Sequence, residues 1–172
     1  MNAPNTSLAW TTTPSPLGPL RLIARGDALA ALIMDPPAEP PPDAEERVEH
    51  PVLTAAILQL GEYFAGTRQV FELPLAPVGT EFQRRVWAAL QEIPYAETIT
   101  YGALSCSLGD PLATRAVGLA NGRNPIGLII PCHRVIGQRG ALTGYAGGVA
   151  RKRWLLDHEA KVAGRAPVLP WG

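Results

Sequence analysis

Hydrophobic residues in the first third of the chain fall into short runs that Pro and Gly separate. These runs cover Trp10–Thr13, Leu20–Ala24 and Ala28–Met34, and each is rich in apolar or β-favouring residues. Pro-Gly signals between runs of strand length mark tight turns. The pattern predicts a small antiparallel meander.

A proline-rich segment separates this meander from the first helical pattern. Residues 35–51 contain six prolines among several acidic residues, which is typical of a mobile loop or linker. From Val52 to Ala65 the apolar residues return at helical spacing, and Gly66 can end the helix in a left-handed conformation. We therefore expect residues 1–78 to form a small α+β domain, in which we find no catalytic constellation.

The second half of the chain opens and closes with helical patterns. Thr80 can cap a helix that Pro94 stops, and Arg151–Glu159 has the pattern of a last helix. The apolar residues of the first pattern are Phe82, Val86, Trp87, Leu90 and Ile93. The last helix has two expected faces, an inward one with Trp154, Leu155 and Leu156 and a mostly solvated one with Arg151, Lys152 and Arg153.

Two short helices between these patterns have the outline of a helix-turn-helix. Thr100 can cap the first, which ends at Gly109-Asp110. Pro111 suits the first turn of the second, which Asp110 caps and which runs over Leu112–Arg123 with Arg115 projecting from a nearly bare side. The small residues of that side are Ala113, Ala116, Gly118, Ala120 and Gly122. Close packing against a neighbouring helix and close approach to a DNA backbone explain such a surface equally well.

Composition narrows the class of protein. The chain of 172 residues is 47% hydrophobic and 17% charged, which is typical of a globular protein with a real core. No run approaches the ~18 apolar residues of a membrane span, and Met1–Trp10 lacks the basic and apolar regions of a secretory signal. Two cysteines, Cys106 and Cys132, and three scattered histidines form neither a disulfide framework nor a zinc-ligand spacing. We expect a cytoplasmic protein without membrane contact, metal or other cofactor.

The net charge of zero conceals two halves of opposite sign. Residues 1–80 carry four basic and nine acidic side chains, a net charge of −5, whereas residues 81–172 carry eleven basic and six acidic ones, a net charge of +5. Such asymmetry points to a polyanion that faces the second half. Nucleic acid is therefore the partner to test.

The stretch Pro131-Cys132-His133-Arg134-Val135 brings a thiol, an imidazole and a guanidinium side by side, directly after apolar residues. A base and a fixed cation can make a neighbouring cysteine a thiolate at neutral pH, and the thiolate is the nucleophile. Free cysteine is also among the most buried residue types, so a structural thiol explains the stretch equally well. These residues alone leave both interpretations open.

Motifs spaced over residues 80–160 resemble those of the O6-alkylguanine-DNA alkyltransferase family, in its bacterial, self-sufficient form, and the first 75 residues match more loosely. The motifs are Thr80-Glu81-Phe82-Gln83, Val86-Trp87, Ile93-Pro94-Tyr95, Tyr101-Gly102, Arg115-Ala116-Val117-Gly118, Asn124-Pro125, Pro131–Val135, Thr143-Gly144-Tyr145 and Leu155–Glu159. The resemblance implies an α+β protein of two domains. Residues 1–78, with the Pro-rich loop 35–51, would form a ribonuclease H-like domain, and residues 79–172 a mostly helical domain with a helix-turn-helix of the winged-helix type.

The resemblance also implies direct reversal of DNA damage. A member of this family binds duplex DNA in the minor groove through its helix-turn-helix and rotates the alkylated guanine out of the stack. Cys132 would take the methyl or alkyl group from O6-alkylguanine, with O4-methylthymine as a second substrate, and keep it as a thioether. Because nothing in the chain suggests a way to remove that group, each molecule would react once, as a methyltransferase without a cofactor.

Four further residues receive catalytic roles from the resemblance. Tyr101 would donate its phenolic proton toward the guanine ring. His133 would deprotonate Cys132 through a bridging water, since neighbouring residues on an extended chain point apart, and Glu159 would orient the imidazole. Asn124 would hold the hinge that precedes the thiol.

The resemblance places Arg115 in the space that the flipped base leaves, where a guanidinium can stack and donate hydrogen bonds at once. The expected DNA contacts are Arg115, Ala116, Gly118, Tyr101 and Arg134. The expected lining of the alkylguanine pocket is Pro131, Tyr145, Ala146 and Gly147. The expected partner is double-stranded DNA that contains O6-alkylguanine, bound by a monomer, and cooperative assembly on DNA stays open.

The chain departs from the family pattern at several positions. Ala96 stands where glycine is common, and Thr100 where serine is frequent, and both suit a turn and an N-cap. Cys106 has no family role, and we expect it to be a small packed hydrophobe. Some relatives bind zinc in the N-terminal domain, but residues 1–80 contain no cysteine and only His50, which excludes that site on ligand count.

Two rival functions belong to other classes. A non-catalytic protein that binds alkylated DNA would lack the nucleophile, whereas Cys132 is present. A cysteine hydrolase built on Cys132 and His133 would turn over, would be indifferent to DNA and would leave the bare, arginine-bearing helix unexplained.

Overall fold

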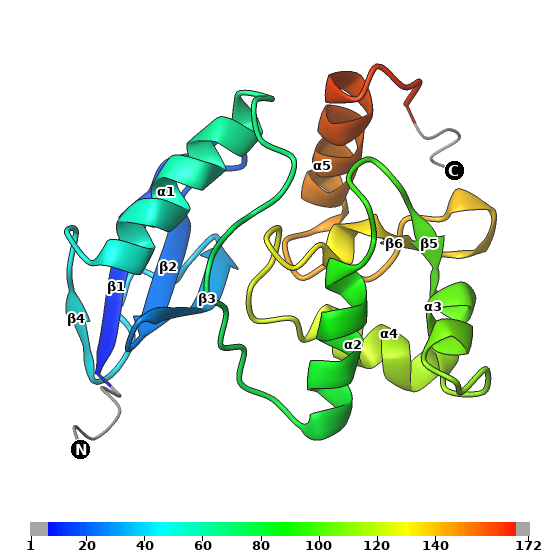
Figure 1. The fold of residues 1–172 in the computed structure, drawn as a ribbon, viewed down its shortest axis with the longest axis horizontal. Coiled ribbons are helices and arrows are strands. Elements are labelled where there is room, and N and C mark those ends of the chain that lie inside the picture. Colours follow the sequence, from blue (N-terminus) through cyan, green and yellow to red (C-terminus); the bar gives the residue numbers. More distant parts are fainter. Residues whose placement is uncertain (1–6, 168–172) are drawn as a thin grey trace. The chain divides into compact units, whose positions relative to one another are not determined.

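A four-stranded sheet forms the framework of the N-terminal unit, Met1–Val78. The computed structural model describes residues 7–167 of the chain. Its strands β1 (Leu8–Thr13), β2 (Leu20–Arg25) and β3 (Ala28–Met34) pair antiparallel (Figure 1). The predicted meander is therefore confirmed.

A fourth strand lies where the sequence predicted only a loop. β4 (Ala44–Glu46) pairs in parallel with β1, with Glu46 beside Trp10 in the register. The Arg47 amide then donates to the Trp10 carbonyl (2.9 Å). Without β4, that edge of β1 would present unpaired N–H and C=O groups, and this requirement outweighs the low strand propensity of an acidic segment. The prediction of a loop throughout residues 35–51 was wrong at this point.

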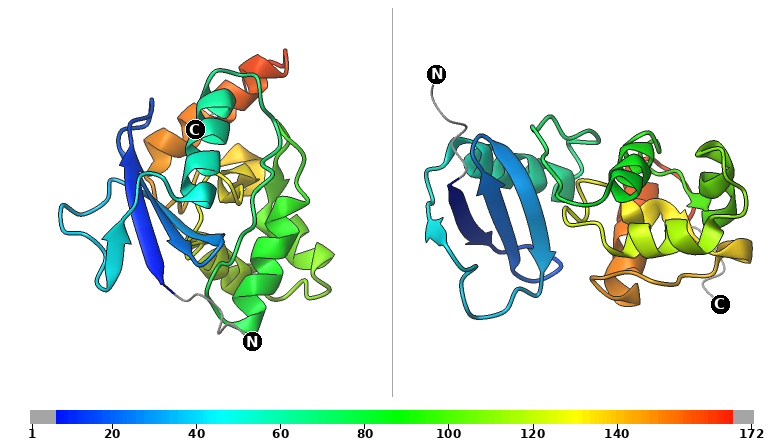
Figure 2. Two further views of the ribbon diagram at one scale, coloured as in Figure 1. Left: turned by 60° about the vertical axis from the view of Figure 1, so that its left-hand side comes forward. Right: turned by 90° about the horizontal axis from the view of Figure 1, so that it is seen from below.

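α1 (Pro51–Phe64) packs on this sheet, as the helical spacing predicted. Pro51 lies in the first turn, where its missing N–H costs no hydrogen bond, and Gly66 follows the helix with φ +79°. The buried hydrophobic residues of α1 are Val52, Leu53, Ala56, Leu60 and Tyr63. α1 contacts β1, β2 and β3 (Figure 2), so the N-terminal unit has a core of its own.

The C-terminal unit, Gly79–Gly172, is mostly helical and begins with α2 (Glu81–Gln91). Thr80 and Gln83 form a reciprocal capping box at its start. The Thr80 hydroxyl accepts from the Gln83 amide (3.1 Å), and the Gln83 side chain accepts from the Thr80 amide (3.0 Å). The N-cap at Thr80 is confirmed, and the helix ends ahead of Pro94 as predicted.

The helix-turn-helix consists of α3 (Tyr101–Ser107) and α4 (Thr114–Gly122). Thr100 caps α3 by accepting from the backbone of the first turn (3.1 Å), as predicted. The buried Trp87 of α2 donates from its indole Nε1 to the Ala120 carbonyl (2.8 Å) and so joins α2 to α4. Figure 1 shows α4 beside α2, a contact that fixes the second helix of the motif.

α4 begins later than predicted, because the residues ahead of it form a turn. The Asp110 carboxylate accepts from the Leu112 amide (3.1 Å), and the Asp110 carbonyl accepts from the Ala113 amide (3.1 Å). The bond from the Ala113 amide joins residues three apart, as in a turn, and the first bond between residues four apart runs from the Val117 amide to the Ala113 carbonyl (2.8 Å). Pro111 therefore lies outside the helix, which starts at Thr114, and the predicted start at Leu112 was wrong.

Two short parallel strands connect the helix-turn-helix with the thiol segment. β5 (Ile99–Thr100) pairs with β6 (Val135–Ile136). β5 leads directly into α3, and β6 follows directly on the 3-10 turn η1 (Cys132–Arg134) and precedes the turn η2 (Gln138–Gly140). The pairing holds Tyr101, the first residue of α3, close to the segment that carries the thiol.

α5 (Val149–Val162) completes the C-terminal unit. Its buried residues are Lys152, Leu155, Leu156, Glu159 and Ala160, which form one stripe at helical spacing. Lys152 belongs to that stripe, so the prediction that it is solvated was wrong, whereas Arg153 is exposed as predicted. Trp154 is half-buried and stacks on His158 with the ring centres 4.9 Å apart. Like every other helix in the described part of the chain, α5 is too short or too polar to cross a membrane.

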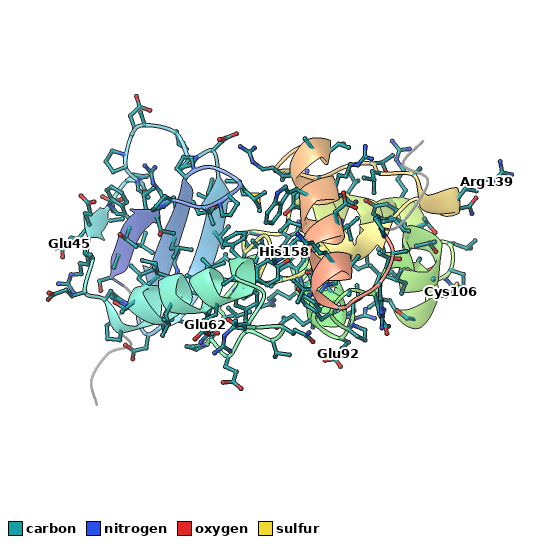
Figure 3. All side chains as sticks on the ribbon, turned by 90° about the horizontal axis from the view of Figure 1, so that it is seen from above. Glu45, Glu62, Glu92, Cys106, Arg139 and His158 are labelled. Atoms are coloured by element: carbon teal, nitrogen blue, oxygen red, sulfur yellow. The ribbon has the colours of Figure 1, made fainter. Side chains whose placement is uncertain are left out.

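Cys106 lies at the surface of α3 (Figure 3). Its neighbours Leu104 and Ser105 are buried, and the helix turns the next side chain toward solvent. The prediction of a packed hydrophobe at Cys106 was therefore wrong.

Candidate active site

Cys132 opens the turn η1, and its side chain is buried. Burial raises the pKa of the thiol, while the Asn124 amide and the Lys152 ammonium act in the opposite direction. Of the two interpretations that the sequence left open, burial of the thiol is the one that the structure shows, and the cost of burying the anion is larger than the combined effect of the neighbouring groups. A nucleophilic Cys132 therefore needs a base that removes its proton.

His133 is oriented to be such a base. Its Nε2 lies 2.8 Å from Glu159 Oε1 in a fully buried pair. Burial lowers the pKa of His133, although Glu159 acts against this. A neutral imidazole beside a carboxylate carries its proton on the nitrogen that faces it, which leaves the lone pair on Nδ1. Nδ1 makes no hydrogen bond with any atom of residues 7–167, so this lone pair can accept a proton.

Glu159 holds the His133 imidazole in place because hydrogen bonds from other residues hold the Glu159 carboxylate in place. Arg134 donates from Nε to Oε2 (3.0 Å) and from Nη2 to Oε1 (3.0 Å), and the Ala96 amide donates to Oε2 (3.2 Å). Burial alone would raise the pKa of this carboxyl, but His133 and Arg134 hold it well below its usual range. Glu159 is charged at neutral pH and accepts hydrogen bonds at both oxygens.

Arg134 belongs to this buried network and not to the surface. Its Nη1 donates to the Ile93 carbonyl (2.7 Å), and its guanidinium lies 5.5 Å from the centre of the Tyr95 ring. The residue is only 7% exposed. The sequence placed Arg134 among the DNA contacts, and the structure corrects this: its guanidinium supports Glu159.

Tyr101 brings a phenol to the same region. Its hydroxyl donates to the Thr143 carbonyl (3.0 Å). Burial raises the pKa of Tyr101, and Cys132 acts in the same direction, so the phenol is protonated at neutral pH and can donate.

The expected pocket residues lie in two segments, with Pro131 buried beside the thiol, Tyr145 and Gly147 half-buried, and Ala146 exposed.

Two asparagines hold the backbone around the thiol. Asn124 bridges the turn before it, donating from Nδ2 to the Ile130 carbonyl (2.8 Å) and accepting at Oδ1 from the Ile126 amide (3.0 Å). Asn121 of α4 donates from Nδ2 to the Cys132 carbonyl (3.4 Å) and is 1% exposed. Sequence reasoning missed Asn121, although a polar residue on the buried side of an amphipathic helix is a detectable signal.

Lys152 is the second site residue that sequence reasoning missed. Its side chain is fully buried, and Nζ donates to the Val135 carbonyl (2.5 Å) and to the Thr143 carbonyl (3.1 Å). Burial lowers the pKa of Lys152 to about 8, and Cys132 acts in the opposite direction. Its position on the apolar stripe of α5 was the signal that could have revealed it.

The outer face of α4 presents one arginine, small side chains and the exposed Leu119. Arg115 and Ala116 are exposed, and Gly118 is half-buried. A Cβ at Gly118 would lie 3.8 Å from the Tyr101 ring, which is an ordinary contact. Packing within the described chain therefore does not require glycine there, and a face of this kind suits the close approach of a partner.

The described residues thus supply a buried thiol, an oriented neutral imidazole and a protonated phenol within one unit. This set suits attack by sulfur on an electrophilic carbon, with a proton acceptor for the thiol and a proton donor for the leaving group. Within residues 7–167 no group of three or more His, Cys, Asp and Glu side chains could hold a metal ion.

Two family models match the chain. The ribonuclease-like domain of 6-O-methylguanine DNA methyltransferase matches residues 8–77, and the DNA binding domain of the same family matches residues 81–161. The matches cover both units that the backbone contacts define.

Curated relatives and solved structures agree with these matches. A methylated-DNA–protein-cysteine methyltransferase of Mycobacterium tuberculosis is 48% identical over 92% of this chain and 94% of the relative. One of Methanosarcina acetivorans is 60% identical over 59% of this chain and 65% of the relative. The crystal structure of Mycobacterium tuberculosis OGT in complex with DNA is similar with a TM-score of 0.83 and 46% identity, covering 93% of this chain and 96% of that one.

Proposed function

Because the chain belongs to the 6-O-methylguanine DNA methyltransferase family, we propose that Cys132 is the residue that accepts the alkyl group. The chain is a DNA-binding methyltransferase of direct-reversal repair, which moves a methyl group from methylated DNA to a cysteine of the protein itself. The observation that supports Cys132 is its buried position next to a histidine that Glu159 orients.

The transfer is a displacement at the alkyl carbon. Cys132 Sγ attacks that carbon, an S–C bond forms, and the bond between the carbon and guanine O6 breaks with its electron pair going to the base. Tyr101 donates its phenolic proton toward the guanine ring and so offsets the charge that develops there. The products are a thioether on Cys132 and an unmodified guanine.

His133 takes the thiol proton through a water molecule that bridges Cys132 Sγ and His133 Nδ1. The free lone pair at Nδ1 supports this direction of transfer, because Nε2 is occupied by Glu159. Glu159 stabilises the imidazolium that results and is itself held by Arg134. Asn124 keeps the turn before the thiol in place.

In this proposal, α4 recognises double-stranded DNA by lying in its minor groove. Arg115 enters the stack where the O6-alkylguanine has left it, and Ala116 and Gly118 allow the helix to approach the backbone. The flipped base enters a pocket lined by Pro131 and the loop that follows Thr143. We further propose that a monomer acts in the cytoplasm and that O4-methylthymine is a second substrate.

A titration of the protein against DNA with radiolabelled O6-methylguanine tests this function. The transfer should stop at one methyl group per chain, because a thioether has no good leaving group. Cys132→Ser should take up no label, whereas Cys106→Ser, a change at the exposed second cysteine, should behave as the wild type. Continued turnover would indicate a hydrolase, and tight binding of the lesion without transfer would indicate a non-catalytic sensor.

A further inference from the structure

The buried side of α4 carries one amide, and its nitrogen connects two groups of the proposed reaction. Asn121 is 1% exposed, and its Nδ2 donates to the Cys132 carbonyl (3.4 Å). The same side chain is a hydrogen-bond partner of the Tyr101 hydroxyl at the start of α3. An amide nitrogen has two N–H groups and can serve both acceptors. Asn121 therefore lies between the proposed nucleophile and the proposed proton donor.

The packing of the helix-turn-helix brings the phenol to this amide. α3 lies against α4 (Figure 1). A Cβ at Gly118 would be 3.8 Å from the Tyr101 ring, so the ring lies close to α4 at that residue. Gly118 and Asn121 are three residues apart and are therefore neighbours on the helix surface. The Tyr101 ring thus lies beside the turn of α4 that carries Asn121.

Asn121 is the donor in its contact with Tyr101. The phenolic proton goes to the Thr143 carbonyl (3.0 Å), so the phenolic oxygen can only accept from Asn121. Asn121 Oδ1 makes no hydrogen bond with any atom of residues 7–167, which leaves Nδ2 as the atom that serves the phenol. The phenolic oxygen therefore accepts an N–H bond while its own proton points elsewhere.

An amide is an unfavourable group to bury at this position. Oδ1 is buried, and a buried acceptor that lacks a hydrogen bond destabilises the folded protein. Leucine has a similar shape and would fill the same space without an unsatisfied oxygen. The presence of the amide in spite of this cost points to a task for its N–H groups.

The proposed reaction gives the N–H groups of Asn121 such a task. When Tyr101 donates to the guanine ring, its O–H bond breaks and the electron pair stays on the phenolic oxygen. A hydrogen bond to a charged acceptor is stronger than one to a neutral acceptor, so the N–H bond strengthens as the proton leaves. Burial raises the pKa of Tyr101, and the Asn121 hydrogen bond acts in the opposite direction. The proton that His133 has taken from the thiol balances the charge of the phenolate.

We propose that Asn121 is a positioning residue for alkyl transfer, whose amide nitrogen aligns the Tyr101 hydroxyl with the Cys132 main chain and stabilises the phenolic oxygen as its proton moves to the base. The proposal rests on the proposed function and gives Asn121 no contact with the alkyl group. Because Asn121 lies on the buried side of α4, its role is in the chemical step and not in the binding of DNA.

The test measures single-turnover transfer from O6-benzylguanine over a range of substrate concentrations. Asn121→Leu should lower the maximum rate about 10- to 100-fold, because a hydrogen bond to a developing charge is lost. The half-saturating concentration should stay within about 2-fold of the wild type, since Asn121 acts on Tyr101 and not on the free substrate.

Val117→Ala is the matched control, since Val117 is buried on the same side of α4 and carries no polar group. It should lower the unfolding temperature but change the maximum rate less than about 2-fold. A loss of rate as large as that of Asn121→Leu would show that packing of α4 is responsible and would overturn the proposal.

A double-mutant cycle with Tyr101→Phe identifies the group through which Asn121 acts. Phenylalanine has no oxygen to accept the N–H bond, so Asn121→Leu should slow the Tyr101→Phe protein less than about 3-fold. An equal loss in both backgrounds would place the effect at the Cys132 carbonyl alone and contradict the proposal, as would a maximum rate of Asn121→Leu that matches the wild type. If Asn121→Leu does not fold, as judged by thermal unfolding, Asn121→Ala carries the same cycle, because it removes the amide and adds no bulk.

The failure of this proposal and the failure of the proposed function give different results. If the function is wrong, the wild-type protein itself takes no benzyl group. If only the role of Asn121 is wrong, the wild type reacts once at Cys132 and the cycle shows no coupling between Asn121 and Tyr101.

Discussion

At the scale of single residues, Glu159 determines how the site is organised. Burial alone would raise the pKa of this carboxyl, but His133 and Arg134 hold it well below the usual range. The charged carboxylate then fixes the imidazole in one tautomer and neutralises the buried guanidinium. The Glu159 side chain therefore links the stability of the fold to the availability of His133 as a proton acceptor.

Replacement of Glu159 by Gln should reduce both stability and activity. Arg134 would be left buried without a counter-charge, which costs roughly 3–5 kcal/mol of unfolding free energy when one partner of a buried pair is removed. Alkyl transfer should also slow, because the imidazole loses its orientation. Urea denaturation and the rate with O6-benzylguanine measure the two effects. Glu97→Gln is the control, since Glu97 is about half exposed and its ion pair with Arg165 is long, at 3.8 Å. A change above about 1 kcal/mol in the unfolding free energy of this control would contradict the account.

The same residue predicts how stability depends on pH. The carboxyl of Glu159 has a lower pKa in the folded than in the unfolded protein, where 4.5 is the reference value. Its contribution is therefore fully present above about pH 4.5 and is lost as the pH falls toward the lowered value. Urea midpoints measured from pH 7 downward should fall more steeply for the wild type than for Glu159→Gln. Parallel pH profiles of the two proteins would show that Glu159 is not the group concerned.

At the scale of elements, α4 separates the proposed DNA-recognition surface from the thiol segment. Its inner side holds Val117, Ala120 and Asn121 in the core, and Asn121 contacts the thiol segment. Its outer side presents Arg115 together with small residues and the exposed Leu119. A change on the outer side should therefore affect DNA repair without disturbing the thiol.

Arg115→Ala is the variant that tests this separation. Repair of O6-methylguanine in duplex DNA should slow about 10- to 100-fold, because the flipped state loses the side chain that replaces the base and flipping costs a few kcal/mol. Reaction with free O6-benzylguanine should change less than about 2-fold, since no base has to leave a stack. Arg153→Ala on the exposed side of α5 is the matched control. Equal losses on both substrates would argue against a role of Arg115 in flipping.

Most elements could be predicted because their ends carry local signals. Thr80 and Thr100 cap their helices as the sequence indicated, and the runs of the meander became β1, β2 and β3. β4 escaped prediction because it pairs with an edge of β1 that is distant in the sequence. The start of α4 escaped prediction because the residues from Asp110 to Ala113 close a turn before the helical hydrogen bonds begin. Lys152 escaped because its charge suggested solvent, whereas its helical position placed it in the core.

The site shows the same division between local and non-local information. The Cys132-His133-Arg134 stretch was visible in the sequence, and Glu159 was brought in by resemblance. The thiol pKa was not predictable, because the burial that raises it depends on segments far away in the chain. The burial of Arg134 was likewise set by Glu159 and Ile93, which its sequence neighbours do not reveal.

At the scale of the whole molecule, the charge of the chain is divided between its two parts. Residues 81–172, which include the helix-turn-helix, carry a net charge of +5, and residues 1–80 carry −5. Phosphate contacts from the positive part release counter-ions, so the logarithm of the DNA association constant should fall linearly with the logarithm of salt concentration. Fluorescence anisotropy with a labelled duplex at increasing potassium chloride measures this slope. A slope of zero would contradict DNA binding through the positive part.

The identity of the alkyl acceptor is the central claim, and peptide mass spectrometry after one round of repair tests it most directly. The wild-type protein is incubated with an excess of duplex DNA that carries O6-methylguanine with an isotopically labelled methyl group, and is then digested. We predict that the label lies entirely on the peptide that contains Cys132, at one methyl group per chain. Label on the Cys106 peptide, or loss of O6-methylguanine from the DNA without label on the protein, would contradict the account.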